Sequence, residues 1–244
     1  MLFIFFIFGL CFGSFAVVLA TRVPNSQDII FTRSHCPKCH KKLNFYELIP
    51  IVSWLILNKK CKNCKSEISA FYPLSELLIG ILAILAYLAK PNLILAIILV
   101  LIFTIFYALS VIDYRLKAVP NSLLMSGYFL AIIYAFLSDI NQILNSFIII
   151  GFMVILKSTL MLRRKSQSQI SEPMGDADSI FIGSMVAILG LWWGIVALFI
   201  GSIIQLVFHL IKKERAIAFI PALFLGFIFA LMLDNFTNIN LGSI

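Results

Sequence analysis

The sequence predicts an all-α polytopic membrane protein with about eight transmembrane helices. Hydrophobic residues make up 61% of its 244 residues, charged residues make up only 12%, and the mean hydropathy is +1.04. About half of a typical soluble domain is apolar, so a soluble fold could not bury this much apolar surface. The apolar runs reach the roughly 20 residues that a membrane helix needs, and they lack the alternating pattern of barrel strands.

The first predicted span covers residues 1–20, and a polar loop at 21–72 separates it from seven further apolar runs. These runs are residues 73–89, 91–112, 119–137, 142–162, 174–191, 192–211 and 216–233. Arg22 follows the first run and no basic residue precedes it, which is the wrong polarity for a cleaved signal peptide. Residues 179–211 carry no formal charge and could form one tilted helix or two spans. Paired tryptophans between glycines in LGLWWG favour an interfacial turn and two spans.

The basic residues predict how the chain is oriented. Alternating the loops between the two sides places 17 Lys and Arg residues on one side and only Lys90 on the other. Cytoplasmic loops carry this excess, so the 21–72 loop is predicted to be cytoplasmic and both termini to lie outside. One span across 174–211 would put KKER outside, which again favours two. The net charge of +8 therefore indicates contact with anionic membrane lipids and not with nucleic acid.

The cytoplasmic loop contains two CxxC pairs with metal-ligand spacing, Cys36 with Cys39 and Cys61 with Cys64. Two such turns can complete a tetrahedral zinc site, and four thiolates would leave no open position, so the zinc would be structural. The alternative is a disulfide or redox pair, which a reducing cytosol and the missing thioredoxin-like context disfavour. We interpret the flanking histidines, His35 and His40, as bystanders. Between the two pairs, LIPIVSWLIL is too short to span and is interpreted as a membrane-surface or re-entrant segment.

Acidic residues at the ends of apolar runs are candidates for chemistry, because a carboxylate near hydrocarbon is costly. Asp113 ends the third span and Asp176 opens the sixth, so the predicted topology puts both at the cytoplasmic boundary. Two carboxylates at one depth can share a proton and act together as acid and base. The alternatives are an ion pair of Asp113 with Arg115 or Lys117, and helix capping by Asp176.

The ordered motifs resemble those of the type IV prepilin peptidases, a family of polytopic aspartic peptidases. GSFAVVLATRVP is similar to the family's opening element, CPKC and CKNC to its zinc loop, and YPLSELLIG to the entry of its second span. IDYRLKAVPN resembles the motif of its first catalytic aspartate, and MGDADSI resembles the Gly-x-Gly-Asp motif of its second. The resemblance implies that Asp113 and Asp176 are catalytic, that the four cysteines bind zinc, and that residues 73–244 form a seven-helix peptidase core.

The resemblance further implies an enzyme of the bacterial inner membrane that cleaves the leader from type IV prepilins and pilin-like secretion proteins. As a second activity it would N-methylate the new N-terminus with S-adenosylmethionine. Glu47 and Glu76 would be candidates for contact with the basic leader. The family's first glycine is Pro173 here, and Asp178 stands where the family usually has a lysine. Competing hypotheses are a peptidase without methyltransferase activity, and a transporter or assembly factor that uses the acids as an ion site.

Overall fold

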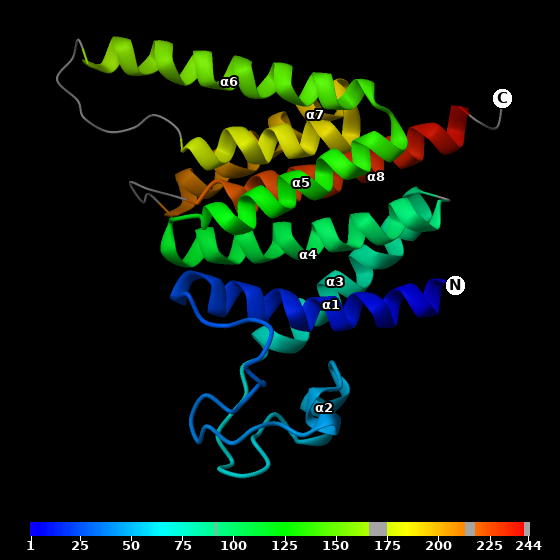
Figure 1. The fold of residues 1–244 in the computed structure, drawn as a ribbon, viewed down its shortest axis with the longest axis vertical. Helices are drawn as coiled ribbons and strands as arrows, with labels where there is room; N and C mark the ends of the chain where they lie inside the picture. The colour runs from blue at the N-terminus through cyan, green and yellow to red at the C-terminus, as the bar shows by residue number, and fades with distance from the viewer. Residues whose placement is uncertain (91, 166–174, 213–217, 242–244) are drawn as a thin grey trace. The chain divides into compact units, whose positions relative to one another are not determined.

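In the computed structural model, all the secondary-structure elements of regular length are helices; the model describes residues 1–90, 92–165, 175–212 and 218–241 (Figure 1). Two isolated β-bridges in the loop after the first helix are the only strand-like pairings among these residues. Within these described ranges, seven helices are long and apolar enough to cross a membrane, and many of their large apolar side chains are exposed. The predicted all-α polytopic fold is therefore confirmed. Three predicted features lie partly outside the described residues. The second aspartate motif lacks Pro173 and Met174, the apolar run 91–112 lacks Pro91, and KKER lacks all but its first lysine.

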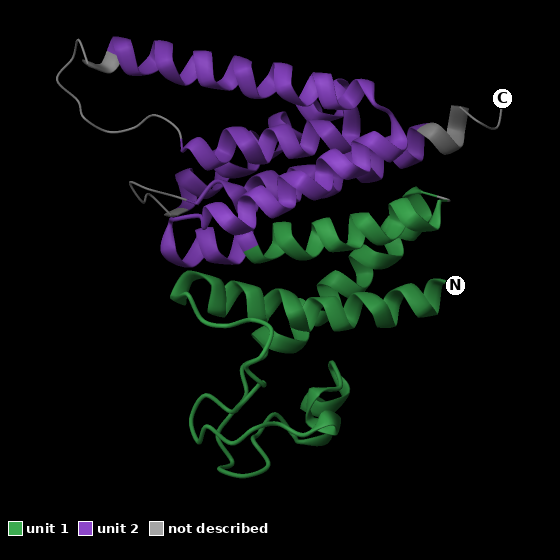
Figure 2. Ribbon diagram, in the orientation of Figure 1, with its two compact units in different colours: residues 1–108 green, residues 109–244 purple. Residues whose placement is uncertain are grey.

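The chain divides into two compact units, residues 1–108 and residues 109–244 (Figure 2). The boundary falls inside helix α4, Leu93–Leu116. The division predicted from sequence separates a first span (1–20), a cysteine loop (21–72) and a peptidase core (73–244). It is drawn by expected function and not by compactness, so it stays a prediction.

The first unit contains α1 (Leu2–Arg22), α3 (Phe71–Ala89), most of α4 and the loop that carries the cysteines. Helices α1 and α3 pack closely because glycines lie at their contact. A Cβ on Gly13 would be 2.6 Å from the Cα of Glu76, and one on Gly9 would be 2.6 Å from the Cβ of Ala83. Close approach of this kind is typical of helix pairs in membranes, where small residues let backbones meet. It also brings the middle of α1, at Gly13, next to Glu76, which binds the loop.

The loop between these helices contains little regular structure. It includes two 3₁₀ turns, Val23–Asn25 and Phe45–Leu48, and the short helix α2, Val52–Ile56. Its apolar middle segment is thus a single short helix. The indole Nε1 of Trp54 donates a hydrogen bond to the carbonyl of Ile68 at 3.1 Å, which ties α2 to the end of the loop.

The second unit contains the end of α4 with α5 (Asn121–Ser138), α6 (Asn141–Lys165), α7 (Asp176–Lys212) and α8 (Ile220–Leu241). Helix α7 contacts α5, α6 and α8 and is the centre of this unit. Its core is built from large side chains that are fully buried, including Tyr134, Phe181 and Phe227.

Helix α7 is interrupted at Gly190, whose φ of 78° and ψ of 172° are not helical. Only glycine adopts such a conformation without strain. After the interruption the chain folds back, because a Cβ on Gly194 would be 3.1 Å from the Cα of Val186, eight residues earlier. In a straight helix these two positions would lie about 12 Å apart along the axis. The two halves run side by side in Figure 1. The predicted pair of spans on either side of LGLWWG agrees with this hairpin.

Candidate active site and metal centre

Asp113 lies within the last turn of α4 and is buried, with 8% of its surface exposed. Its Oδ2 accepts a hydrogen bond from the backbone N–H of Ile220, the first residue of α8, at 3.0 Å. The amide of Phe219 is a second donor to the same carboxyl group. Unpaired N–H groups at a helix N-terminus are suited to holding a carboxylate. Asp113 is therefore a buried acid whose position is set by the start of α8.

Asp176 is the first residue of α7, and its side chain is 87% exposed. Its Oδ1 lies 2.5 Å from the Nζ of Lys157, a residue of α6 whose side chain is only 11% exposed. The partner that the structure gives to Asp176 is thus a buried lysine.

Asp178 is the acid that the structure brings to Asp113. It is half-buried, and both the carboxylate of Asp113 and the ammonium of Lys157 act on its charge. Its Oδ2 also accepts a hydrogen bond from the N–H of Gly175 at 3.3 Å, which secures it within the first turn of α7. Residues two apart on a helix differ by about 200° in direction, so the side chains of Asp176 and Asp178 leave α7 on different sides.

The four predicted zinc ligands form one cluster. The sulfur atoms of Cys36, Cys39, Cys61 and Cys64 all lie within 4.8 Å of one another, and no disulfide joins them. The Sγ atoms of Cys36 and Cys64 are 3.8 Å apart, which is about the spacing that a tetrahedral site with Zn–S bonds near 2.3 Å requires. Four thiolates with this spacing suit a tetrahedral metal such as zinc. The donor set therefore fits a closed structural metal site, and neither histidine belongs to the cluster.

Two turns of matching geometry hold these cysteines, and they are related by a shift of 25 positions. Each first cysteine pairs its N–H with a carbonyl five residues later, Cys36 with Lys41 and Cys61 with Ser66. Each turn also has a positive φ at the fourth residue after its first cysteine, at His40 and Lys65. The repeat follows the two CxxC pairs of the sequence. Its symmetry places two sulfurs from each turn around one centre.

Backbone amides prepare the first turn for a metal ion. The N–H groups of Cys39 and Lys38 donate to the sulfur of Cys36, and they outweigh burial and lower the pKa of this thiol to about 6. The amides of Cys64 and Asn63 also donate to the sulfur of Cys61, but burial and hydrogen bonds with the sulfurs of Cys36 and Cys64 outweigh them and raise the pKa of this thiol. Because the thiolate is the form that binds metal, these donors favour a loaded site.

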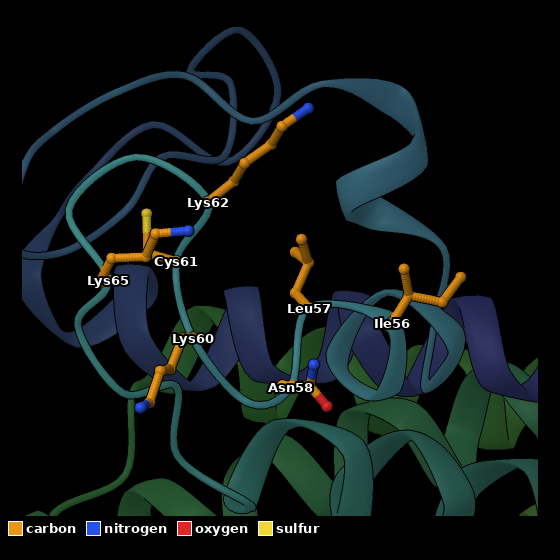
Figure 3. A pocket seen from close by; sticks show the side chains of 7 residues that line it. All are labelled: Ile56, Leu57, Asn58, Lys60, Cys61, Lys62 and Lys65. Carbon is orange, nitrogen blue, oxygen red and sulfur yellow. The ribbon is translucent and has the colours of Figure 1, made fainter.

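A pocket beside the second turn is lined by residues from α2 and from the turn itself. Ile56 and Leu57 supply apolar surface, and three lysines supply positive charge (Figure 3); the full lining is Ile56, Leu57, Asn58, Lys60, Cys61, Lys62 and Lys65. Lys62 also donates a hydrogen bond to the hydroxyl of Tyr46 at 3.0 Å, which lowers the pKa of the tyrosine. The second cysteine turn and the end of α2 thus present a basic, partly apolar surface.

The two acids predicted to contact a basic leader have partners within the protein. Glu47 caps the 3₁₀ turn that it belongs to, where its Oε2 accepts the N–H of Asn44 at 2.7 Å. Glu76 is buried in α3 and accepts the N–H of Ile51 at 2.7 Å and a hydrogen bond from the Ser14 hydroxyl. Both acids hold the loop in place, so the structure gives them a positioning role.

The arrangement defines a polytopic membrane protein with a four-cysteine loop. It also has an acidic cluster, Asp113, Asp176 and Asp178, at one end of its second helical unit. Two family models match the chain: the bacterial peptidase A24 N-terminal domain over residues 7–90, and the type IV leader peptidase family over residues 98–210. The chain belongs to the type IV leader peptidase family. No solved structure matches it.

Several curated relatives carry the name prepilin leader peptidase/N-methyltransferase. The Myxococcus xanthus protein is 51% identical over 32% of this chain and 23% of its own length. The Vibrio cholerae protein is 34% identical over 54% of this chain and 56% of its own length. The Neisseria gonorrhoeae protein is 29% identical over 89% of this chain and 85% of its own length. The alignments thus span about a quarter and about half of the first two relatives, and most of the third.

The assignment of Asp176 from the motif passes over Asp178, although the sequence also contains a signal for Asp178. Gly175-Asp176-Ala177-Asp178 matches Gly-x-Gly-Asp with the first glycine kept and alanine in place of the second. In this register the final aspartate is Asp178, and Ile180 stands where the family's lysine is expected. The other register, which selects Asp176, matches the second glycine of the motif to Gly175. Both registers contain one departure at a glycine, so spacing alone does not choose between them.

Proposed function

We propose that this chain is a membrane aspartic endopeptidase that removes the leader peptide from type IV prepilins and pilin-like secretion proteins. The observation that carries the proposal is the buried carboxyl group of Asp113, whose charge acts on the carboxyl group of Asp178 at one end of a bundle of apolar helices. Family membership and the names of the relatives support the same activity. A prepilin would present its leader at the membrane surface, where this end of the unit would meet it.

In this proposal Asp113 and Asp178 work as a pair that shares one proton. The ionised member takes a proton from the attacking water, and the protonated member donates a hydrogen bond to the scissile carbonyl. The ionisation steps belong to the pair, so acid and base roles are not assigned to single residues. The N–H of Ile220 keeps Asp113 in place while the proton moves.

The assignment from sequence, Asp113 with Asp176, is the competing pair. We prefer Asp178 because Asp113 acts on its carboxylate, whereas Asp176 is mostly exposed and is held by Lys157.

The four cysteines would hold one zinc ion with a structural role, because all four tetrahedral positions are taken by protein sulfur. S-adenosylmethionine would supply the methyl group for N-methylation of the cleaved product, and we assign no residue to this step. The basic loop would lie on the cytoplasmic side and both termini outside, as the charge distribution predicts.

The deciding experiment is to co-express the full chain with a prepilin and weigh the pilin by mass spectrometry. Asp113→Asn and Asp178→Asn should each reduce leader removal by at least about 100-fold, because each removes one member of the acid–base pair. Asp176→Asn should retain cleavage within about tenfold of the wild type, because its side chain lies outside the pair. Immunoblots of the membrane fraction control for the amount of each variant.

Normal cleavage by the Asp178→Asn variant together with loss of cleavage by Asp176→Asn would restore the competing pair. Cleavage by the wild type without the mass of one added methyl group would leave a peptidase without methyltransferase activity. A wild type that never removes a leader would favour the rival function, a transporter or assembly factor with an ion site among the acids.

A further inference from the structure

Lys157 places a buried positive charge beside the acidic cluster. It lies eight residues before the end of α6, and 11% of its side chain is exposed. A buried lysine is rare unless it is paired, because removing an ammonium from water is costly. Its Nζ contacts the carboxylate of Asp176, and its charge also acts on Asp178. Lys157 therefore links the exposed acid at the start of α7 with the acid that faces Asp113.

The helices of the second unit carry few other charged groups that could act on the start of α7. Helix α4 contributes Asp113, which acts on Asp178, and it also carries the cation Arg115 in its last turn. Helix α5 has no charged residue, and Asp234 of α8 lies 14 residues, or about 21 Å along the helix, from Ile220. On α6, Arg163 is exposed and lies six residues beyond Lys157. Among the described residues, Lys157 is thus the cation whose charge acts on Asp178.

We propose, resting on the function above, that Lys157 is a positioning residue for the catalytic pair and that Asp176 balances its charge. Its contact with Asp176 joins α6 to the first turn of α7 and so sets where Asp178 lies relative to Asp113. Its ammonium also favours the ionised member of the pair. Asp176 offsets part of this positive charge, so the pair can still keep the one proton that general acid catalysis needs.

This arrangement predicts opposite effects for the two partners of the ion pair. In Lys157→Met the cation is lost while the apolar stem remains, so ionisation of the pair becomes harder. The pH profile of cleavage should then move to higher pH by about one unit. In Asp176→Asn the charge of Lys157 is no longer balanced, so the profile should move to lower pH by a similar amount, about one unit. Lys157→Arg keeps the charge and should keep the profile of the wild type.

The experiment measures kcat and KM against pH for the full chain in nanodiscs, with a purified prepilin as the substrate. At its own optimum, Lys157→Met should lower kcat about tenfold and change KM less than about twofold, because the interaction serves the reaction and not substrate binding. Arg163→Met is the matched control: it removes an exposed cation from the same helix and should leave the profile in place.

Profiles that move in the same direction, or that stay in place while the rate falls, would show that the ion pair only supports the fold. If Lys157→Met is not recovered in the membrane, an unshifted profile for Asp176→Asn overturns the proposal by itself. An inactive wild type overturns the proposed function and this inference together. An active wild type whose variants share one profile overturns this inference alone.

Discussion

At the scale of single residues, Glu76 shows how a buried acid can organise a loop. Its carboxylate accepts the N–H of Ile51, a residue with a φ of 60° and a ψ of −50°. Such a conformation is strained for a β-branched side chain and persists only where its surroundings hold it. The N–H of Val52 donates to the carbonyl of Pro50, which closes a tight turn around Ile51. Glu76 therefore stabilises this turn by accepting the N–H of Ile51.

Replacing Glu76 with leucine should release the segment around Ile51. The change leaves a strained turn without its acceptor, and losing a buried hydrogen bond to a charged group costs about 1.5–3 kcal/mol. Hydrogen exchange of the amides at residues 49–57 should become at least about tenfold faster. Glu76→Gln keeps one acceptor oxygen and should have a smaller effect. Unchanged exchange in the leucine variant would mean that Glu76 does not hold the turn.

At the scale of elements, the first unit depends on how closely α1 approaches α3. Arg22, at the end of α1, donates to the carbonyls of Asp28 and Thr32 and so directs the chain into the loop. Glu76 of α3 holds the middle of the same loop. The distance between the two helices therefore decides whether both attachments can form.

Gly13→Ala should separate α1 from α3. The added methyl group would lie 2.6 Å from the Cα of Glu76, which is backbone and cannot move aside. Overpacking of this kind costs about 1–3 kcal/mol, so the unfolding temperature in detergent should fall by several degrees. Gly151→Ala is the matched control, because a Cβ on Gly151 meets nothing within 4 Å. Equal unfolding temperatures for the two variants would contradict the proposed close contact.

At the scale of the whole molecule, the two candidate sites lie in different compact units. The four cysteines belong to residues 1–108, and the acidic cluster belongs to residues 109–244. With all four tetrahedral positions taken by protein sulfur, a bound metal would stabilise the loop and offer no open position for chemistry. This separation makes the two sites testable one at a time.

Cys36→Ser should abolish metal binding and loosen the loop while the second unit stays folded. Removing one of four thiolates opens the site, and metal binding free energy is also folding free energy for such a loop. Elemental analysis should find zinc in the wild type and almost none in the variant, and protease should then cut the loop first. Cys11→Ser is the control, because Cys11 lies in α1 outside the cluster. Equal zinc in both variants would contradict the four-cysteine site.

Hydropathy and spacing predicted much of this molecule because they depend on local properties of the chain. Long apolar runs can satisfy their backbone groups in a membrane only as helices, and the break near Gly190 was visible as a glycine beside paired tryptophans. The cysteine cluster was predictable because two CxxC turns can form one tetrahedral site. The hydrogen bonds of Glu47 and Glu76 were not predictable, since both residues bind backbone groups of an irregular loop.

The sequence by itself determined the class of fold, and it singled out the four cysteines as candidate metal ligands and Asp113 as a candidate acid. It also placed two aspartates, Asp176 and Asp178, at the start of one helix, and either of them fits the family motif. Only the tertiary structure separated them, turning one toward Lys157 and bringing the other near Asp113. The physical reason is that helix geometry points neighbouring acids in different directions, whereas the packing of α7 within its unit decides which direction leads to a partner.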